Sequence, residues 1–235
     1  MGQYWMPILH ADGSKEPKEY VCTHYWNNGY KFLEHSWIGN EVPSLVMYRI
    51  YKNPMHVAWV GDYYTHSVWK RGPTGGRLWR PAEQGKMLSL INYNTVPSYM
   101  KHKGEFIPED YETFKEISDD EVEEIQTMFN SENIVNYVIL NHTKNVYLSM
   151  KEYMEKTPES FKNLVMHPLP VLTATVGSMG DGMGDYRESQ STNWNRVGTW
   201  MWDILSVEED PPENFNKVNI DEYTFQEVRK DETDD

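Results

Sequence analysis

The chain contains a single cysteine, Cys22, so it cannot form an intrachain disulfide. One free thiol is typical of proteins in reducing compartments, and we therefore expect a cytoplasmic protein. The chain also lacks any run of about 18 apolar residues, so we predict no transmembrane helix and no membrane partner. Its first residues, Met1-Gly2-Gln3-Tyr4-Trp5, lack the basic and apolar regions of a signal peptide.

Basic residues are scarce: 22 Lys and Arg stand against 36 Asp and Glu, for a net charge of -14. The imbalance is marked in residues 208–235, where eleven acidic side chains against three basic ones give -8. Phosphate backbones repel such a chain, so we expect no direct nucleic-acid partner. The acidic segment is either a solvated tail that aids solubility or a surface that covers a basic protein partner.

Aromatic residues are abundant, with 9 Trp and 16 Tyr, while hydrophobic residues make up 39% of the chain. A large aromatic side chain can bury roughly 150–250 Å², so these residues are expected to supply much of the core. The hydrophobic content, together with 25% charged residues, predicts a folded domain.

Predicted strands and helices are intermixed without a regular βαβα order. Strands are expected at residues 3–9, 55–60, 134–140, 168–175 and 197–207, and helices at residues 42–51 and 119–129. This pattern predicts an α+β fold with a mixed, mostly antiparallel sheet and a few flanking helices. We expect one domain over residues 1–207, with residues 61–105 as a long loop or insertion and residues 208–235 as an acidic tail. The loop carries a basic cluster of Lys70, Arg71, Arg77 and Arg80, which either receives an anionic ligand or pairs with the tail.

Two segments share the pattern Trp-x-x-Asp: Trp59-Val60-Gly61-Asp62 and Trp200-Met201-Trp202-Asp203. A Trp and a carboxylate placed together at a strand end are typical of small-ligand pockets. We predict a ligand-binding site built from both segments and from the residues around Trp37. Its members are Trp37, Asn40, Trp59, Asp62, Tyr63, Trp200 and Asp203. The alternative is that the two aspartates cap turns, as strand-end aspartates often do.

His35 lies just before the helix expected at residues 42–51, for which Asn40 is the predicted N-cap. An imidazole titrates near neutrality, so His35 is a candidate general acid or base. Asp62 and Asp203 are candidate carboxylates for the same catalytic work. The alternative is that His35 and Trp37 form a packed pair at a strand end.

A glycine-rich stretch from Gly177 to Tyr186 contains two weak metal-ligand candidates, Asp181 and Asp185. Carboxylates suit Ca²⁺ or Mg²⁺, but the stretch is equally consistent with a flexible connection and lacks EF-hand spacing. The remaining histidines have no zinc-site spacing, and no cofactor is identified by a motif.

Four segments together resemble a family of small proteins from bacteria and their phages. They are Met1-Gly2-Gln3-Tyr4-Trp5, Leu33-Glu34-His35-Ser36-Trp37-Ile38-Gly39-Asn40, Trp59-Val60-Gly61-Asp62-Tyr63, and Gly184-Asp185-Tyr186 followed by Val197-Gly198-x-Trp200. The resemblance spans most of residues 1–207 and implies a single cytoplasmic domain. It brings no established activity, so it assigns no catalytic residue. Members tend to have Trp-Ala-Gly-Asp where this chain has Trp200-Met201-Trp202-Asp203.

These observations favour a cytoplasmic binding protein of phage or bacterial origin. It would either sequester a small anionic ligand such as a nucleotide or inhibit a host protein, for example a defence protein. One alternative is a hydrolase or transferase that acts on a nucleotide through His35, Asp62 and Asp203. A second alternative is an acidic inhibitor of a nucleic-acid-binding protein.

Overall fold

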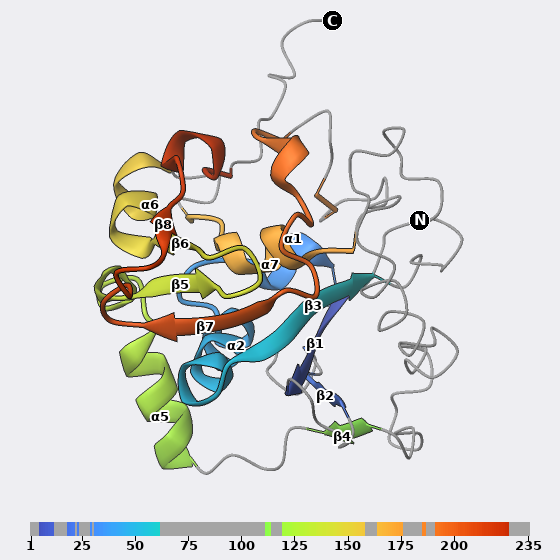
Figure 1. Cartoon of the computed structure of the whole chain (residues 1–235). Coiled ribbons are helices and arrows are strands. Elements are labelled where there is room, and N and C mark those ends of the chain that lie inside the picture. The colour runs from blue at the N-terminus through green and yellow to red at the C-terminus, as the bar shows by residue number, and fades with distance from the viewer. Residues whose placement is uncertain are drawn as a thin grey trace, which may run out of the picture.

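One sheet runs through the computed structural model, with the strand order β4-β2-β1-β3-β7-β5-β6-β8 (Figure 1). The structure describes residues 5–11, 18–21, 23, 29, 31–61, 111–113, 119–157, 164–175, 185–186 and 191–225. The strands are β1 (Trp5–Ala11), β2 (Lys18–Tyr20), β3 (Met55–Gly61), β4 (Tyr111–Thr113), β5 (Val138–Asn141), β6 (Val146–Ser149), β7 (Ile204–Glu208) and β8 (Asn216–Lys217).

Five of the seven pairings in this sheet are antiparallel. The two parallel pairings, β2 with β4 and β6 with β8, lie at opposite edges of the sheet. The predicted α+β fold with a mixed, mostly antiparallel sheet is therefore confirmed.

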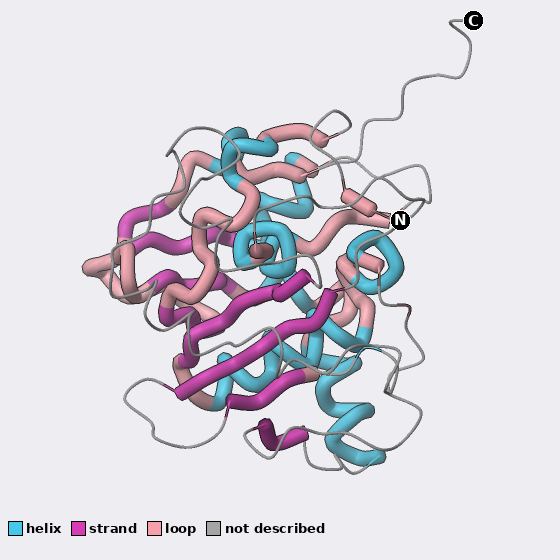
Figure 2. Tube along the Cα trace, turned by 90° about the vertical axis from the view of Figure 1, so that its right-hand side faces the viewer, coloured by secondary structure: helices cyan, strands magenta, loops and turns pink. Residues whose placement is uncertain are grey.

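Helices and single helical turns lie mainly to one side of the strands, as Figure 2 shows. The helices are α1 (Phe32–His35), α2 (Glu41–Lys52), α5 (Asp119–Met128), α6 (Met150–Lys156) and α7 (Pro168–Thr173). The 3₁₀ turns are η3 (Ile134–Asn136), η5 (Trp194–Arg196) and η6 (Ile220–Glu222). Helix α2 packs against β7 and α5, and α7 packs against β3.

Helix α2 forms where the sequence predicted it. The Asn40 side chain accepts a hydrogen bond from the Val42 backbone N–H at 2.9 Å, which satisfies one of the donors that a helix start leaves unpaired. The helix ends before Asn53-Pro54, because the residue before a proline disfavours helical angles. The predicted N-cap role of Asn40 is confirmed.

Strand β3 lies at the centre of the core, and all seven of its residues are buried. Alternate residues of a strand point to opposite faces, so burial along the whole strand means that both faces are covered. Large aromatic residues fill much of the surrounding space. The fully buried ones include Trp5, Trp59, Trp200, Trp202, Tyr153 and Phe225.

Three predicted strands are wrong in part or in full. Residues 134–136 form η3, so the strand predicted at residues 134–140 begins only at Val138. Residues 168–173 form helix α7, whose first turn accommodates Pro168 and whose N-cap is His167. A short apolar run reads the same in a buried strand and in a buried helix, which explains the error. Residues 197–202 form consecutive turns, and the strand predicted at residues 197–207 begins only at Ile204.

Residues 208–225, which were expected to belong to an acidic tail, pack onto the domain. Strand β8 pairs with β6, and Phe225 has no exposed surface. Exposed ion pairs join Lys217 to Glu152 and Lys156 to Asp221. The folded domain therefore continues at least to Phe225.

The buried position of Phe225 predicts a large stability effect. Phe225→Ala should lower the free energy of unfolding by about 3–5 kcal/mol, because it removes a buried ring and leaves a cavity. Leu164→Ala is the matched control, since Leu164 is 38% exposed, and it should change that energy by less than about 1 kcal/mol. Urea unfolding measures both. Equal effects of the two variants would contradict the packing described here.

Candidate functional site

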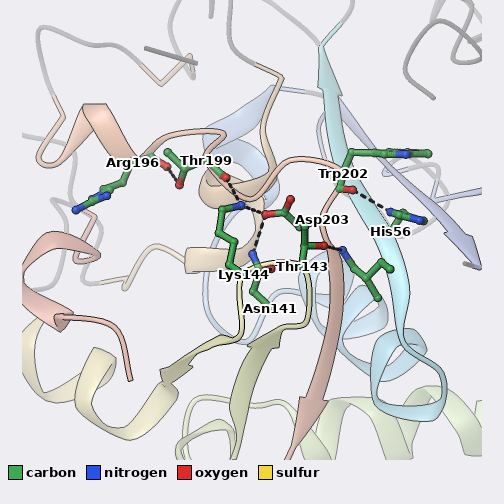
Figure 3. A network of polar contacts seen from close by, with 9 residues as sticks. His56, Asn141, Thr143, Lys144, Arg196, Thr199, Trp202 and Asp203 are labelled. Atoms are coloured by element: carbon green, nitrogen blue, oxygen red, sulfur yellow. Dashed lines mark hydrogen bonds and ion pairs between the residues drawn. The ribbon is translucent and has the colours of Figure 1, made fainter. Parts of the chain in front are cut away.

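The carboxylate of Asp203 lies at the centre of the polar contacts drawn in Figure 3. Its side chain is 1% exposed. The Asp203 Oδ2 atom accepts a hydrogen bond from Asn141 Nδ2 at 2.8 Å and forms an ion pair with Lys144 Nζ. The same ammonium donates to the Thr199 carbonyl at 2.9 Å. A buried carboxylate needs compensating partners, so these contacts hold the turn at residues 199–203 in place.

The partners of Asp203 come from the hairpin that joins β5 to β6. Asn141 is the last residue of β5, and Lys144 lies in the turn that follows. Two more contacts join that turn to the start of β7: the Ile204 N–H donates to Thr143 Oγ1 at 3.0 Å, and the His142 N–H donates to the Ile204 carbonyl at 2.9 Å. The hairpin and the segment before β7 therefore form one hydrogen-bonded unit.

Trp202, which precedes Asp203, has a φ of 61°, a left-handed conformation that is strained for a bulky residue. Its N–H donates to the Val57 carbonyl at 2.7 Å, and its carbonyl accepts from His56 Nδ1 at 2.9 Å. The indole also stacks on two imidazoles, at 5.5 Å from His56 and 6.2 Å from His10. These contacts hold the strained residue against β3 and β1.

Arg196 is the last residue of η5, which leads into this turn. It contacts two consecutive residues of the C-terminal segment. Its guanidinium carbon lies 5.1 Å from the centre of the Tyr223 ring, and one of its terminal nitrogens forms an ion pair with Glu222. The Tyr223 ring also contacts the Trp200 indole, with centroids 5.8 Å apart and planes inclined by 52°. Both Arg196 Nε and Trp200 Nε1 are buried, and neither has a hydrogen-bond acceptor within the described ranges.

His35 is fully buried, and both ring nitrogens have partners. Nδ1 lies 3.1 Å from the Gly29 carbonyl, and Nε2 accepts a hydrogen bond from Trp59 Nε1 at 3.1 Å. A carbonyl only accepts, so Nδ1 carries the proton and the ring is neutral. Burial lowers the pKa of His35 to about 4. The structure pairs His35 with Trp59, whereas the sequence suggested Trp37, and its acid or base role stays a prediction.

The other predicted ligand residues lie in the core or at its border. Trp37 is 5% exposed and donates its indole N–H to the Leu33 carbonyl at 2.6 Å. Trp59 and Trp200 flank helix α7: Trp59 forms a bridge with Ala174, and the Trp200 N–H donates to the Leu172 carbonyl at 2.8 Å. Thus the structure brings Trp59 to His35 and places Trp200 and Asp203 on one turn. Their roles in ligand binding stay predictions.

Several candidates lie outside the described residues: Asp62, Tyr63, Asp181 and the basic cluster of Lys70, Arg71, Arg77 and Arg80. Asp185 is described and is 2% exposed. Within the described ranges, no three His, Cys, Asp or Glu side chains are grouped so that they could hold a metal ion. Nor does any described helix have the length and apolar character needed to cross a membrane.

Sequence reasoning missed two cations of this site, Lys144 and Arg196, and the aromatic ring of Tyr223. Lys144 lies 59 residues from Asp203, and Arg196 approaches Tyr223 only because the chain folds back after β8. No local motif marks either cation. The one available signal was that they are among few basic residues in a strongly acidic chain.

Comparison of the chain with protein-family models, with curated proteins and with solved structures found no match. The functional argument therefore rests on the geometry of the described residues.

The ion pair of Lys144 with Asp203 predicts that removing Lys144 lowers stability more than removing an exposed lysine. Lys144→Met should lower the free energy of unfolding by about 1–3 kcal/mol, because it leaves a buried carboxylate with less compensation. The lower part of that range is expected, since the Lys144 side chain is 39% exposed and water screens the pair. Lys156→Met is the control, because Lys156 and Asp221 are both mostly exposed, and should cost less than about 0.5 kcal/mol. Chemical denaturation that gives the same loss for both would refute the argument.

Two buried histidines predict a loss of stability in mild acid. Burial lowers the pKa of His35 to about 4 and that of His167 to about 3, from an ordinary value of 6.5. Between pH 6.5 and pH 4 the unfolded chain therefore binds protons that the folded chain does not. The free energy of unfolding should fall with decreasing pH by about 1.4 kcal/mol per pH unit for each histidine.

The variant His167→Asn isolates the contribution of His167 to this pH dependence. The Nδ1 atom of His167 accepts the Leu169 N–H at 3.1 Å, and an asparagine can replace it as the cap of α7. In urea titrations between pH 5 and pH 6.5, His167→Asn should therefore remove about 1.4 kcal/mol per pH unit from the slope. An unchanged slope would show that His167 is not held neutral.

Proposed function

We propose that this chain is a non-catalytic binding protein for a small anionic ligand with a planar aromatic ring, such as a nucleotide. The binding site is the turn formed by residues 194–203. The observation that carries the proposal is the pair of buried N–H donors, Arg196 Nε and Trp200 Nε1, which have no acceptor in the described part of the chain. Buried donors are normally paired, and an anionic oxygen is a strong acceptor for them.

The charges of the turn support an anionic ligand. The chain has a net charge of -14, so an anion can bind only where cations are held locally. Arg196 and Lys144 supply two such cations, and each is now paired with a carboxylate, Glu222 and Asp203 respectively. The Glu222 side chain is 45% exposed, whereas Asp203 is buried. An incoming anion would therefore compete with Glu222 for Arg196 and leave the Asp203 contacts intact.

Aromatic residues in the same turn support a planar ring. Stacking of a base on an aromatic side chain contributes about 1–3 kcal/mol. Trp200 is the candidate to supply it, because the Tyr223 ring already contacts it, with centroids 5.8 Å apart and planes inclined by 52°. Asp203 acts here as a positioning residue, since its carboxylate holds the turn and Lys144. The resemblance to bacterial and phage proteins makes a bacterial cytoplasm the expected setting.

A second candidate function rests on the surface of helix α5. Four acidic side chains of this ten-residue helix are exposed, and its sequence contains no basic residue. They are Asp120, Glu121, Glu123 and Glu124. The opposite side of the helix is anchored by Ile125, which is 3% exposed. Such a face complements a basic protein surface, as expected of an inhibitor of a nucleic-acid-binding protein.

Titration of the full chain with AMP, GMP, CMP and UMP tests the first candidate. At least one should bind saturably, and Arg196→Gln should weaken binding at least tenfold, about 1.4 kcal/mol, through loss of a charge-assisted contact. Lys217→Gln is the control, because Lys217 is an exposed lysine paired with Glu152 in another part of the structure, and it should leave the affinity unchanged. If no nucleotide binds either the parent chain or the Tyr223→Ala variant, the proposal is wrong. The acidic face of α5 then becomes the candidate.

A further inference from the structure

Residues 219–225 form a strap, which includes η6 and crosses the ligand site described above. We propose that the strap closes this site by occupying it, and that the aromatic anion binds when Tyr223 and Glu222 are displaced. The inference rests on the proposed function. It adds that the site is regulated from within the same chain.

The strap presents the two chemical groups that the proposed ligand would present. Tyr223 places an aromatic ring 5.8 Å from the centre of the Trp200 ring and 5.1 Å from the Arg196 guanidinium. Glu222, the preceding residue, places a carboxylate on the same guanidinium. A nucleotide would bring a base and a phosphate to the same two side chains. The strap therefore imitates the ligand with residues of this chain.

The imitation is incomplete. Trp200 has no exposed surface, yet its Nε1–H meets no acceptor among the residues described. The Arg196 Nε atom likewise meets no acceptor among these residues, although the Arg196 side chain is 32% exposed and one of its terminal nitrogens is paired with Glu222. Leaving a buried donor unpaired is costly. A ligand that brings additional acceptor oxygens can satisfy groups that the strap leaves without partners, which allows it to compete.

The ion pair that holds the strap lies near the surface, whereas Ile220 and Tyr223 pack against the hydrophobic core. Lys156 and Asp221 form an ion pair at 3.1 Å, with both side chains more than half exposed. The Asn193 amide donates to the carbonyls of Asp221 and Thr224, each at 2.9 Å. An exposed ion pair such as that of Lys156 with Asp221 contributes little to stability. Phe225, in contrast, is fully buried. Displacing residues 219–224 therefore breaks mainly the partly buried contacts of Ile220 and Tyr223, while Phe225 remains anchored in the core.

Tyr223→Ala tests this inference, with Tyr223→Phe as the matched control. The alanine variant vacates the site, so it should bind AMP, GMP, CMP or UMP at least tenfold more tightly than the parent chain. The phenylalanine variant keeps the ring and should bind as the parent does. The indole Nε1–H resonance of Trp200 in ¹⁵N spectra should shift when the nucleotide binds, which locates the ligand.

The outcomes separate the inference from the proposed function. Equal affinity of Tyr223→Ala and the parent chain would overturn the strap and leave the proposed function standing. Absence of binding by both would overturn the proposed function itself. If Tyr223→Ala fails to fold, Glu222→Gln provides the test, because it frees Arg196 and retains the ring. It should tighten binding several-fold, and an unchanged affinity would again overturn the strap.

Discussion

The need to compensate the buried carboxylate of Asp203 organises this part of the molecule. Its partners, Asn141 and Lys144, come from the β5–β6 hairpin. Asp203 itself lies between the turns at residues 197–202 and the start of β7. A buried charge is costly without partners, so the position of the turn at residues 199–203 depends on the position of the hairpin. The same ammonium binds the Thr199 carbonyl, so one charge pair also fixes the backbone beside Trp200.

Backbone strain next to this carboxylate has a visible compensation. Trp202 has a left-handed φ of 61°, a conformation that glycine adopts without strain. Here the tryptophan is held by two backbone contacts, to Val57 and His56, and by stacking on His56 and His10. Aromatic packing thus takes the place of the conformational freedom that glycine would provide.

Ring packing also surrounds His35 and the turn that carries Trp200. His35 is neutral, buried and hydrogen-bonded to Trp59, and this pair belongs to the core. In the turn at residues 194–203, the buried donors Arg196 Nε, Trp200 Nε1 and Trp202 Nε1 have no acceptors in the described structure, and the same holds for Trp5 Nε1 in the core. Arg196 and Trp200 meet the strap, whose Tyr223 is partly exposed. Buried donors without acceptors beside a partly exposed ring are the physical basis of the proposed binding function.

Local signals in the sequence alone determined the α+β class, helix α2 with its Asn40 cap, and the aromatic core. Each depends on hydrogen bonds within a few residues or on the spacing of apolar side chains, which the sequence displays directly. Only the tertiary structure decided that residues 168–173 are helical, that Lys144 neutralises Asp203, and that Phe225 closes the core from within an acidic segment. These features depend on pairing and burial between residues far apart in the chain. A short apolar run or a single charge is compatible with several partners, and the packed fold selects one of them.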